Sequence, residues 1–100
     1  MKPVTIHPEA EAEVEESSDF YETRRIGLGA DFETEVQAAI ARVALMPTGF
    51  PRHGKTGYRK AFVSRFPYTI FFLEMDDVIW VAAVAHQRRQ PDYWSGRTPN

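Results

Sequence analysis

The sequence contains no cysteine and no long apolar run. Without cysteine the chain can form neither disulfides nor thiolate metal sites, and it has no thiol nucleophile. No apolar stretch approaches the roughly 18 residues that suggest a membrane span. The N-terminal segment MKPVTIHPEAEAEVEE also lacks the apolar core of a signal peptide. We therefore expect a soluble, cytoplasmic protein that does not interact with a membrane.

The residues that are present predict one folded domain with an uneven charge. With 43% hydrophobic residues in 100, the chain can bury one modest core, and we expect a single domain over residues 1–100. Residues 1–50 hold four Lys or Arg and ten Asp or Glu, a formal charge of −6, whereas residues 51–100 hold eight and four, a formal charge of +4. A basic half can face a polyanion or an acidic partner, or the two halves can simply form solvated faces of different charge.

The first half of the sequence predicts a strand followed by two helices. The segment PVTIH is a short β-branched run between prolines, which is typical of a strand. A helix pattern follows from Pro8 to about Arg25, with a narrow stripe of small residues that favours close packing on a neighbour. Glycines in IGLGADF end this helix, and a second helix runs to about Met46. Two helices joined by so few residues predict an antiparallel helical hairpin.

The second half predicts three strands and a short tail. The strands are expected in YRKAFV, YTIFFLE and VIWVAAVAH, with a hairpin link at MDD and a short helix or turn around residues 91–94. The order β-α-α-β-β-β predicts an α+β fold, in which the helix hairpin packs on one face of a mainly antiparallel four-stranded sheet. The other face of the sheet is expected to be relatively open. Trp94 is expected to anchor the tail on the sheet, with contact to a target as the alternative.

Cationic and aromatic side chains cluster near the end of the last predicted strand. Arginine offers a planar fork to phosphate or carboxylate, histidine moves protons near neutral pH, and tyrosine can stack on a base or donate a proton. The pattern therefore favours a surface that contacts a phosphodiester or binds a charged protein. The alternative is an ordinary solvated strand end. The candidate binding residues are Arg59, Lys60, Arg65, His86, Arg88, Arg89, Tyr93 and Trp94.

Other possible sites are weaker. His7 and His53 lack metal-ligand spacing with each other or with His86, so we expect no metal and no cofactor. The segment GKTG lacks the earlier glycine of a phosphate-binding loop and precedes a strand instead of a helix. The carboxylates Glu11, Glu13, Glu15 and Glu16 are interpreted as a solvated helix face.

The segment YRKAFVSRFPYTIFFLEMDDVIWVAAVAHQRRQPDYW resembles the C-terminal half of the RelE/ParE superfamily of toxins from type II toxin–antitoxin systems. The HPEA helix start and the GLGADF break are similar to its first half, so the resemblance covers nearly the whole chain. It implies a bacterial toxin that inhibits growth, can stabilise a plasmid, and is neutralised by a cognate antitoxin. RelE-like members cleave mRNA on the ribosome without a metal, whereas ParE-like members inhibit DNA gyrase.

The positions that distinguish the two branches favour the ParE-like one. RelE-like nucleases carry an arginine directly after the tyrosine that opens the middle strand, where this chain has Thr69. A second arginine is expected just past the last strand, where this chain has Gln87, although Arg88 and Arg89 follow directly. With this set incomplete, stabilisation of charge at a scissile phosphate is expected to be poor. The resemblance therefore implies gyrase inhibition.

A nuclease remains the alternative, and it assigns roles to the same residues. Arg88 or Arg89 would stabilise the phosphate and Tyr93 or His86 would transfer protons. Lys60, with Arg59 and Arg65, would hold the RNA, and the ribosome and mRNA would be the partners. A third reading is an inactive relative that only binds its antitoxin. Whether the chain is an enzyme stays open at this point.

Overall fold

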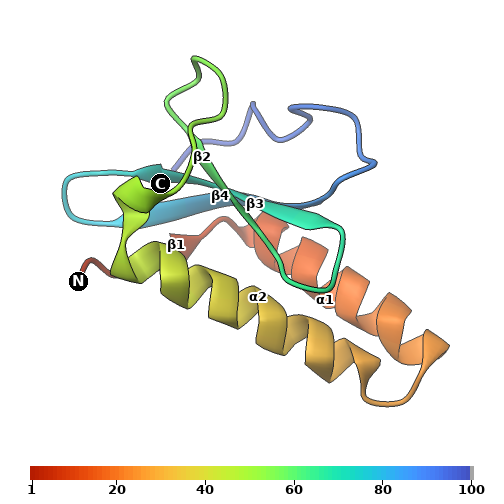
Figure 1. Cartoon of the computed structure of the whole chain (residues 1–100). Helices are drawn as coiled ribbons and strands as arrows, with labels where there is room; N and C mark the ends of the chain where they lie inside the picture. The colour runs from red at the N-terminus through yellow and green to blue at the C-terminus, as the bar shows by residue number, and fades with distance from the viewer. Residues whose placement is uncertain (100) are drawn as a thin grey trace.

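Within residues 1–99, which the computed structural model describes, a helical hairpin packs against one four-stranded sheet (Figure 1). The order of helices and strands is the predicted β-α-α-β-β-β, with a short 3-10 helix, η1, before the second strand. The elements are β1 (Val4–Ile6), α1 (Pro8–Arg24), α2 (Leu28–Leu45), η1 (Pro47–Gly49), β2 (Arg59–Phe62), β3 (Tyr68–Glu74) and β4 (Ile79–His86).

The helix boundaries follow from local chemistry. At the start of α1 the His7 ring accepts a hydrogen bond from the Glu9 amide at 3.1 Å. Pro8 occupies the first turn, where its missing N–H leaves no bond unmade. Gly27 has a φ of 90°, a conformation that favours glycine, and it separates the two helices. Both helices end within a residue of the predicted positions, whereas α2 begins at Leu28, inside the predicted break.

The two helices approach closely where their chains turn. A Cβ atom added to Gly29 would lie 2.6 Å from the Ser18 backbone oxygen, so only glycine fits at this point of α2. The Ser18 hydroxyl donates a hydrogen bond to Glu33, and Glu22 accepts from the Gly27 and Gly29 amides at the start of α2. These contacts confirm that α1 packs tightly on its neighbour through small residues.

The sheet has the strand order β1-β4-β3-β2. Strand β3 pairs antiparallel with both β2 and β4, and Tyr68 lies opposite His86 at the end of the β3–β4 ladder. Strand β1 instead pairs parallel with the first part of β4, with Val4 opposite Ile79. The mainly antiparallel four-stranded sheet is thus confirmed, and one of its three pairings is parallel.

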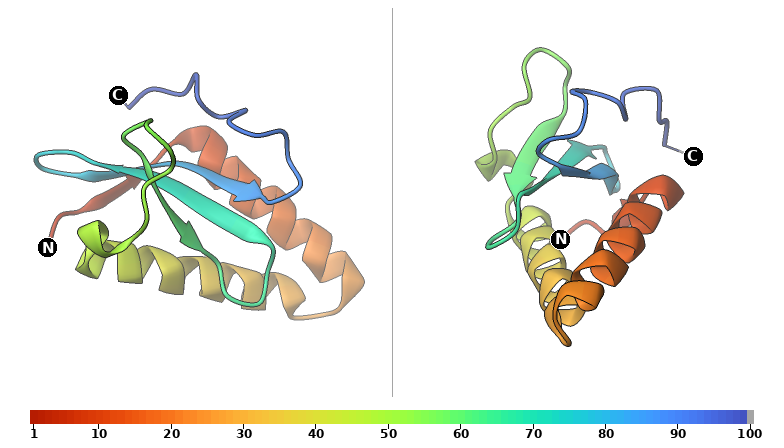
Figure 2. Two further views of the ribbon diagram at one scale, coloured as in Figure 1. Left: turned by 45° about the horizontal axis from the view of Figure 1, so that its top comes forward. Right: turned by 90° about the vertical axis from the view of Figure 1, so that its right-hand side faces the viewer.

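One face of the sheet packs against the helix hairpin to form the main core (Figure 2, left). Alternate residues of the strands point to this side, as the pleat of a sheet requires. The largest buried side chains of this core have essentially no exposed surface, and they are Phe32, Phe72, Ile70, Ile79, Val43, Val81 and Val84.

The prediction of an open second face is wrong. Trp94 is 2% exposed and stacks on Phe71 of β3 with 4.6 Å between the ring centroids. Tyr58 contacts the same tryptophan, and together with Trp80 and alanines of β4 these rings form a second, smaller core. The tail after β4 reaches this position through turns in residues 91–96. The anchoring position predicted for Trp94 is therefore observed.

No helix in residues 1–99 combines the length and apolar character needed to cross a membrane.

Candidate functional site

The clustered cations follow the point where β4 leaves the sheet. The strand ends at His86, and the next amide, Gln87, donates a hydrogen bond to the Pro67 carbonyl at 2.8 Å. This bond closes the end of the sheet, so the chain turns away at Arg88 and Arg89, which are both exposed. The arrangement presents two guanidinium groups to solvent at one end of the molecule.

His86 is oriented by two contacts. Its Nδ1 accepts a hydrogen bond from the Arg88 backbone amide at 3.0 Å, and its ring packs edge-on against Tyr68 at 5.1 Å between centroids. Because Nδ1 accepts, the neutral ring carries its proton on Nε2. His86 therefore offers a donor beside the two arginines.

The Tyr93 side chain is held through both its ring and its hydroxyl group. The Arg89 guanidinium stacks on its ring, with the central carbon 3.9 Å from the ring centroid. Its hydroxyl donates a hydrogen bond to Glu13 of α1. Burial, together with this bond to a carboxylate, raises the pKa of Tyr93 well above its usual value. A phenol in this state does not readily give up a proton.

Glu13 joins α1, β4 and the tail. It accepts two hydrogen bonds from Arg97, at 2.9 and 3.2 Å, and one from the Val84 amide at 3.0 Å. Arg97 also donates to the Ala82 carbonyl at 2.9 Å. Strand β1 pairs only with residues 79–81 of β4. Beyond that pairing, the Glu13 and Arg97 side chains provide the hydrogen-bond partners of the β4 backbone. Burial lowers the pKa of Arg97, but the bond and charge of Glu13 outweigh it and raise the pKa overall.

The interpretation of Glu13 as a solvated residue is therefore wrong, because its side chain is only 12% exposed in its pairing with Arg97. The sequence held a signal for this. Glu13 is three residues after Ala10 and four before Ser17, so it falls on the stripe of α1 that faces the protein. Nothing local pointed to Arg97, which lies 84 residues away.

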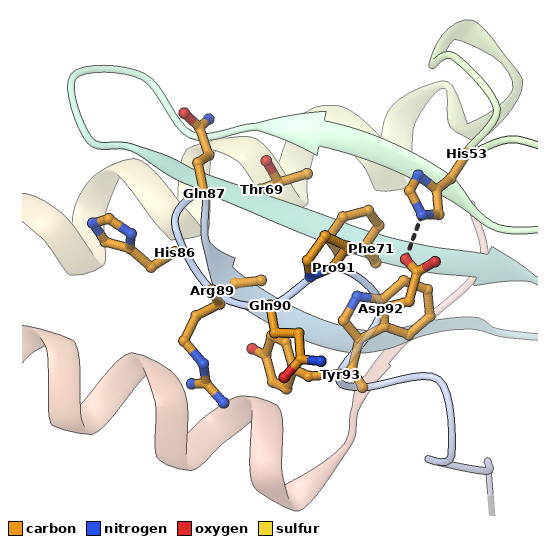
Figure 3. A pocket seen from close by; sticks show the side chains of 12 residues that line it. His53, Thr69, Phe71, His86, Gln87, Arg89, Gln90, Pro91, Asp92 and Tyr93 are labelled. Carbon is orange, nitrogen blue, oxygen red and sulfur yellow. Dashed lines mark hydrogen bonds and ion pairs between the residues drawn. The ribbon is translucent and has the colours of Figure 1, made fainter.

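Four of the predicted site residues line one pocket of about 200 Å³ on the second face of the sheet (Figure 3). His53 and Asp92 close one side of it, with 2.7 Å between Nε2 and Oδ1 (dashed in Figure 3). This contact was not predicted, since the two residues are 39 positions apart. The lining residues are His53, Thr69, Phe71, Ala85, His86, Gln87, Arg89, Gln90, Pro91, Asp92, Tyr93 and Trp94.

The remaining predicted site residues do not line this pocket. Arg59 donates to the Phe50 carbonyl at 2.7 Å and so secures the loop before β2. Arg65 forms ion pairs of 3.6 Å with Asp31 and with Glu35 of α2. Lys60 lies opposite Phe71 in the β2–β3 ladder, and the exposed Arg88 is outside the pocket lining. The expected grouping of all the cations on one side is thus only partly realised.

The pocket lining combines cationic, polar and aromatic side chains. Within the described part of the chain, no group of three or more His, Asp or Glu side chains is arranged to hold a metal ion. Thr69, at the position where a nuclease would carry arginine, is 6% exposed and brings no charge to the pocket. The lining instead offers the Arg89 guanidinium, the His86 ring and the amides of Gln87 and Gln90 beside aromatic rings.

Comparison with known proteins agrees with this architecture. One solved structure, the chromosomal ParDE toxin–antitoxin system from P. aeruginosa, contains a chain that superposes with a TM-score of 0.75. The two sequences are 16% identical, and the match covers 86% of this chain and 96% of that one, which establishes a common fold. Among curated proteins, no sequence matches significantly. A family model for the ParE toxin of the type II toxin–antitoxin system parDE matches residues 4–91, and the chain therefore belongs to the ParE toxin family.

Proposed function

We propose that this ParE-family chain acts by binding and inhibiting DNA gyrase, and that a cognate antitoxin neutralises it. The observation that carries this proposal is the state of Tyr93. In the nuclease alternative either this tyrosine or His86 transfers protons, but here the Tyr93 hydroxyl is bonded to Glu13 and its pKa is raised. A residue held in this way supports its neighbours more readily than it exchanges protons.

The surroundings of Tyr93 support the same conclusion. Thr69 brings no cation to the pocket, so Arg89 is the one arginine in the lining that a developing phosphate charge would meet there. Arg88 and Arg89 are exposed on a turn whose ends are fixed by the sheet and by the buried Trp94. Two cations presented by a rigid support suit the recognition of an acidic protein surface.

The proposal is tested by adding purified toxin to a DNA gyrase supercoiling assay. We expect supercoiling to stop at toxin excess and to recover when the protein encoded beside the toxin gene is added. Mapping of mRNA 5′ ends after induction supplies the counter-test, and no new ends within translated messages are expected. Normal supercoiling combined with new mRNA ends would contradict gyrase inhibition and support the nuclease alternative.

A further inference from the structure

The loop before β2 and the tail after β4 lie on the same face of the sheet, away from the helices (Figure 1). The chain closes a loop between His53 and Tyr58, because the His53 amide donates a hydrogen bond to the Tyr58 carbonyl at 2.8 Å. The Thr56 hydroxyl donates to the His53 carbonyl at 2.6 Å and fixes the same residue again. The loop thereby holds the His53 ring over β3, with 4.8 Å between its centroid and that of Phe71.

The His53 ring meets the tail at Asp92. Nε2 of His53 lies 2.7 Å from Oδ1 of Asp92, and since a carboxylate only accepts, Nε2 carries the proton and donates it to this bond. The two side chains are 25% and 48% exposed, so the contact is partly shielded from water. Asp92 has a φ of 58°, a left-handed conformation that is uncommon for a residue other than glycine. The contact with His53 thus fixes the tail at a residue with an uncommon backbone conformation.

Asp92 ends the segment that carries the exposed arginines, residues 87–92, which we call the arginine turn. At its start the Gln87 amide donates to the Pro67 carbonyl at 2.8 Å. At its end the Asp92 carboxylate accepts from His53, on the other side of the pocket from His86 (Figure 3). The arginine turn is therefore tied to the sheet at one end and to the loop before β2 at the other.

The arginines between these two points have local hydrogen bonds. The Arg88 amide donates to Nδ1 of His86 at 3.0 Å, and the Arg89 amide donates to the His86 carbonyl at 2.9 Å. Both bonds lie within three residues, so they shape the turn but do not set where it lies on the molecule. That position depends on the two ends of the turn.

We propose that His53 and Asp92 are positioning residues, whose contact orders the arginine turn and holds Arg88 and Arg89 in the arrangement that binds the target. The inference rests on the proposed function, because it takes these arginines as gyrase-binding groups. An ordered turn loses less conformational freedom on binding than a mobile one, so the contact strengthens binding without touching the target.

Loss of the contact should loosen the arginine turn without releasing the tail. Trp94 is 2% exposed and stacks on Phe71, and the Tyr93 hydroxyl is bonded to Glu13. These contacts are independent of the His53 donor. Variants of the pair are therefore expected to fold, and circular dichroism of each variant checks this.

The test compares full-length variants of the toxin in the gyrase supercoiling assay. His53→Phe keeps a ring against Phe71 but removes the Nε2 donor, and we expect it to raise the toxin concentration for half-inhibition about threefold to fivefold. His53→Gln keeps a side-chain N–H donor toward Asp92 and should inhibit within about twofold of the original chain. If the ring served only for packing, the order would be reversed, because glutamine loses the ring and phenylalanine keeps it.

Hydrogen exchange of the toxin alone measures the order of the arginine turn. In His53→Phe the Arg88 and Arg89 amides should exchange at least about threefold faster than in the original chain. The Gln87 amide, which is bonded to the Pro67 carbonyl, should exchange at an unchanged rate.

Variants of Asp92 test the other side of the contact and decide if His53→Phe unfolds. Asp92→Gly removes the carboxylate at a left-handed position without adding strain, and it should weaken inhibition as His53→Phe does. Asp92→Asn keeps an oxygen acceptor and tolerates the same backbone, so it should behave like the original chain. Combining His53→Phe with Asp92→Gly should have little more effect than either change alone.

The matched control removes a different surface ion pair. Glu74 pairs with Lys2 at 3.0 Å, at the end of β3 opposite the arginine turn. Glu74→Ala should leave both the half-inhibiting concentration and the exchange of the Arg88 and Arg89 amides within about twofold of the original chain.

The outcomes separate this inference from the function on which it rests. Inhibition by the original chain that His53→Phe and Asp92→Gly leave unchanged would overturn the positioning role and leave gyrase inhibition intact. Unchanged exchange of the Arg88 and Arg89 amides in these variants, or an equal loss of inhibition in Glu74→Ala, would also overturn it. No inhibition by the original chain would overturn the proposed function and the positioning role together.

Discussion

At the scale of single residues, Glu13 connects the parts of the chain that carry the candidate site. Its carboxylate is bonded to the tail through Tyr93 and Arg97 and to the sheet through the Val84 amide. The position of Arg89 depends on this connection, because its guanidinium stacks on the Tyr93 ring that Glu13 holds. A carboxylate from the first helix thus positions a binding surface formed about 75 residues later in the chain.

The raised pKa of Tyr93 predicts a particular response to alkaline pH. The folded chain keeps the phenol proton above pH about 10, where the unfolded chain begins to lose it. The unfolded state then binds fewer protons, so the free energy of unfolding falls as the pH rises. Tyr93→Phe should show a shallower fall than the original chain between pH 9 and 11 in urea unfolding, as well as a loss of about 1–2 kcal/mol at pH 7 from the missing bond to a carboxylate. If the free energy of unfolding falls equally steeply with pH in the two proteins, the pKa of Tyr93 is not raised in the folded chain.

At the scale of secondary structure, the local pattern was enough to place both α-helices and all four strands, whereas η1 lies in a segment that was predicted as a loop. Strand β3 has the predicted bounds because YTIFFLE is rich in aromatic and β-branched residues and a proline precedes it. Helix α2 was predictable because its apolar residues recur with helical spacing and reach from Leu28 to a proline stop. The pairing of β1 with β4 was not predicted as parallel, since no local pattern records which strand a segment will meet across 75 residues.

The contact between the helices predicts that Gly29→Ala destabilises the protein. Alanine in a helix interior is ordinarily more favourable than glycine by about 1 kcal/mol. Here the new methyl group would lie 2.6 Å from the Ser18 backbone oxygen, so the hairpin must open. We expect a net loss of about 1–3 kcal/mol in thermal or urea unfolding. Gly96→Ala, where nothing lies within 4 Å of the new Cβ, serves as the control and should change stability little. A stabilised Gly29→Ala protein would mean that the helices are farther apart than described.

At the scale of the whole molecule, the tail turns a one-core fold into one with two cores. Trp94 was expected to anchor the tail, but its partners in the loop before β2 were not, because that loop is polar and glycine-rich. The His53–Asp92 contact and the Glu13–Arg97 pair are likewise long-range. Such contacts depend on the path of the folded chain, so no local sequence pattern could predict them.

The second core predicts the effect of removing its central ring. Trp94→Ala should lower the free energy of unfolding by about 3 kcal/mol and expose apolar sheet surface, which binding of a hydrophobic dye would detect. Phe62→Ala is the control, because this aromatic side chain of β2 is 56% exposed, and it should cost less than about 1 kcal/mol without increasing dye binding. If the two variants behave alike, the tail does not cover the sheet in solution.

If the cations after β4 bind DNA gyrase, as we propose, two double variants should differ in the supercoiling assay, which is the most direct measurement. We predict that Arg88→Ala/Arg89→Ala raises the toxin concentration needed for half-inhibition at least about tenfold, equivalent to about 1.4 kcal/mol of binding energy. Arg24→Ala/Arg25→Ala removes the same charge from the C-terminal end of α1, outside the turn after β4, and should leave that concentration nearly unchanged. Equal inhibition by both variants and the original chain would contradict a role of Arg88 and Arg89 in binding gyrase.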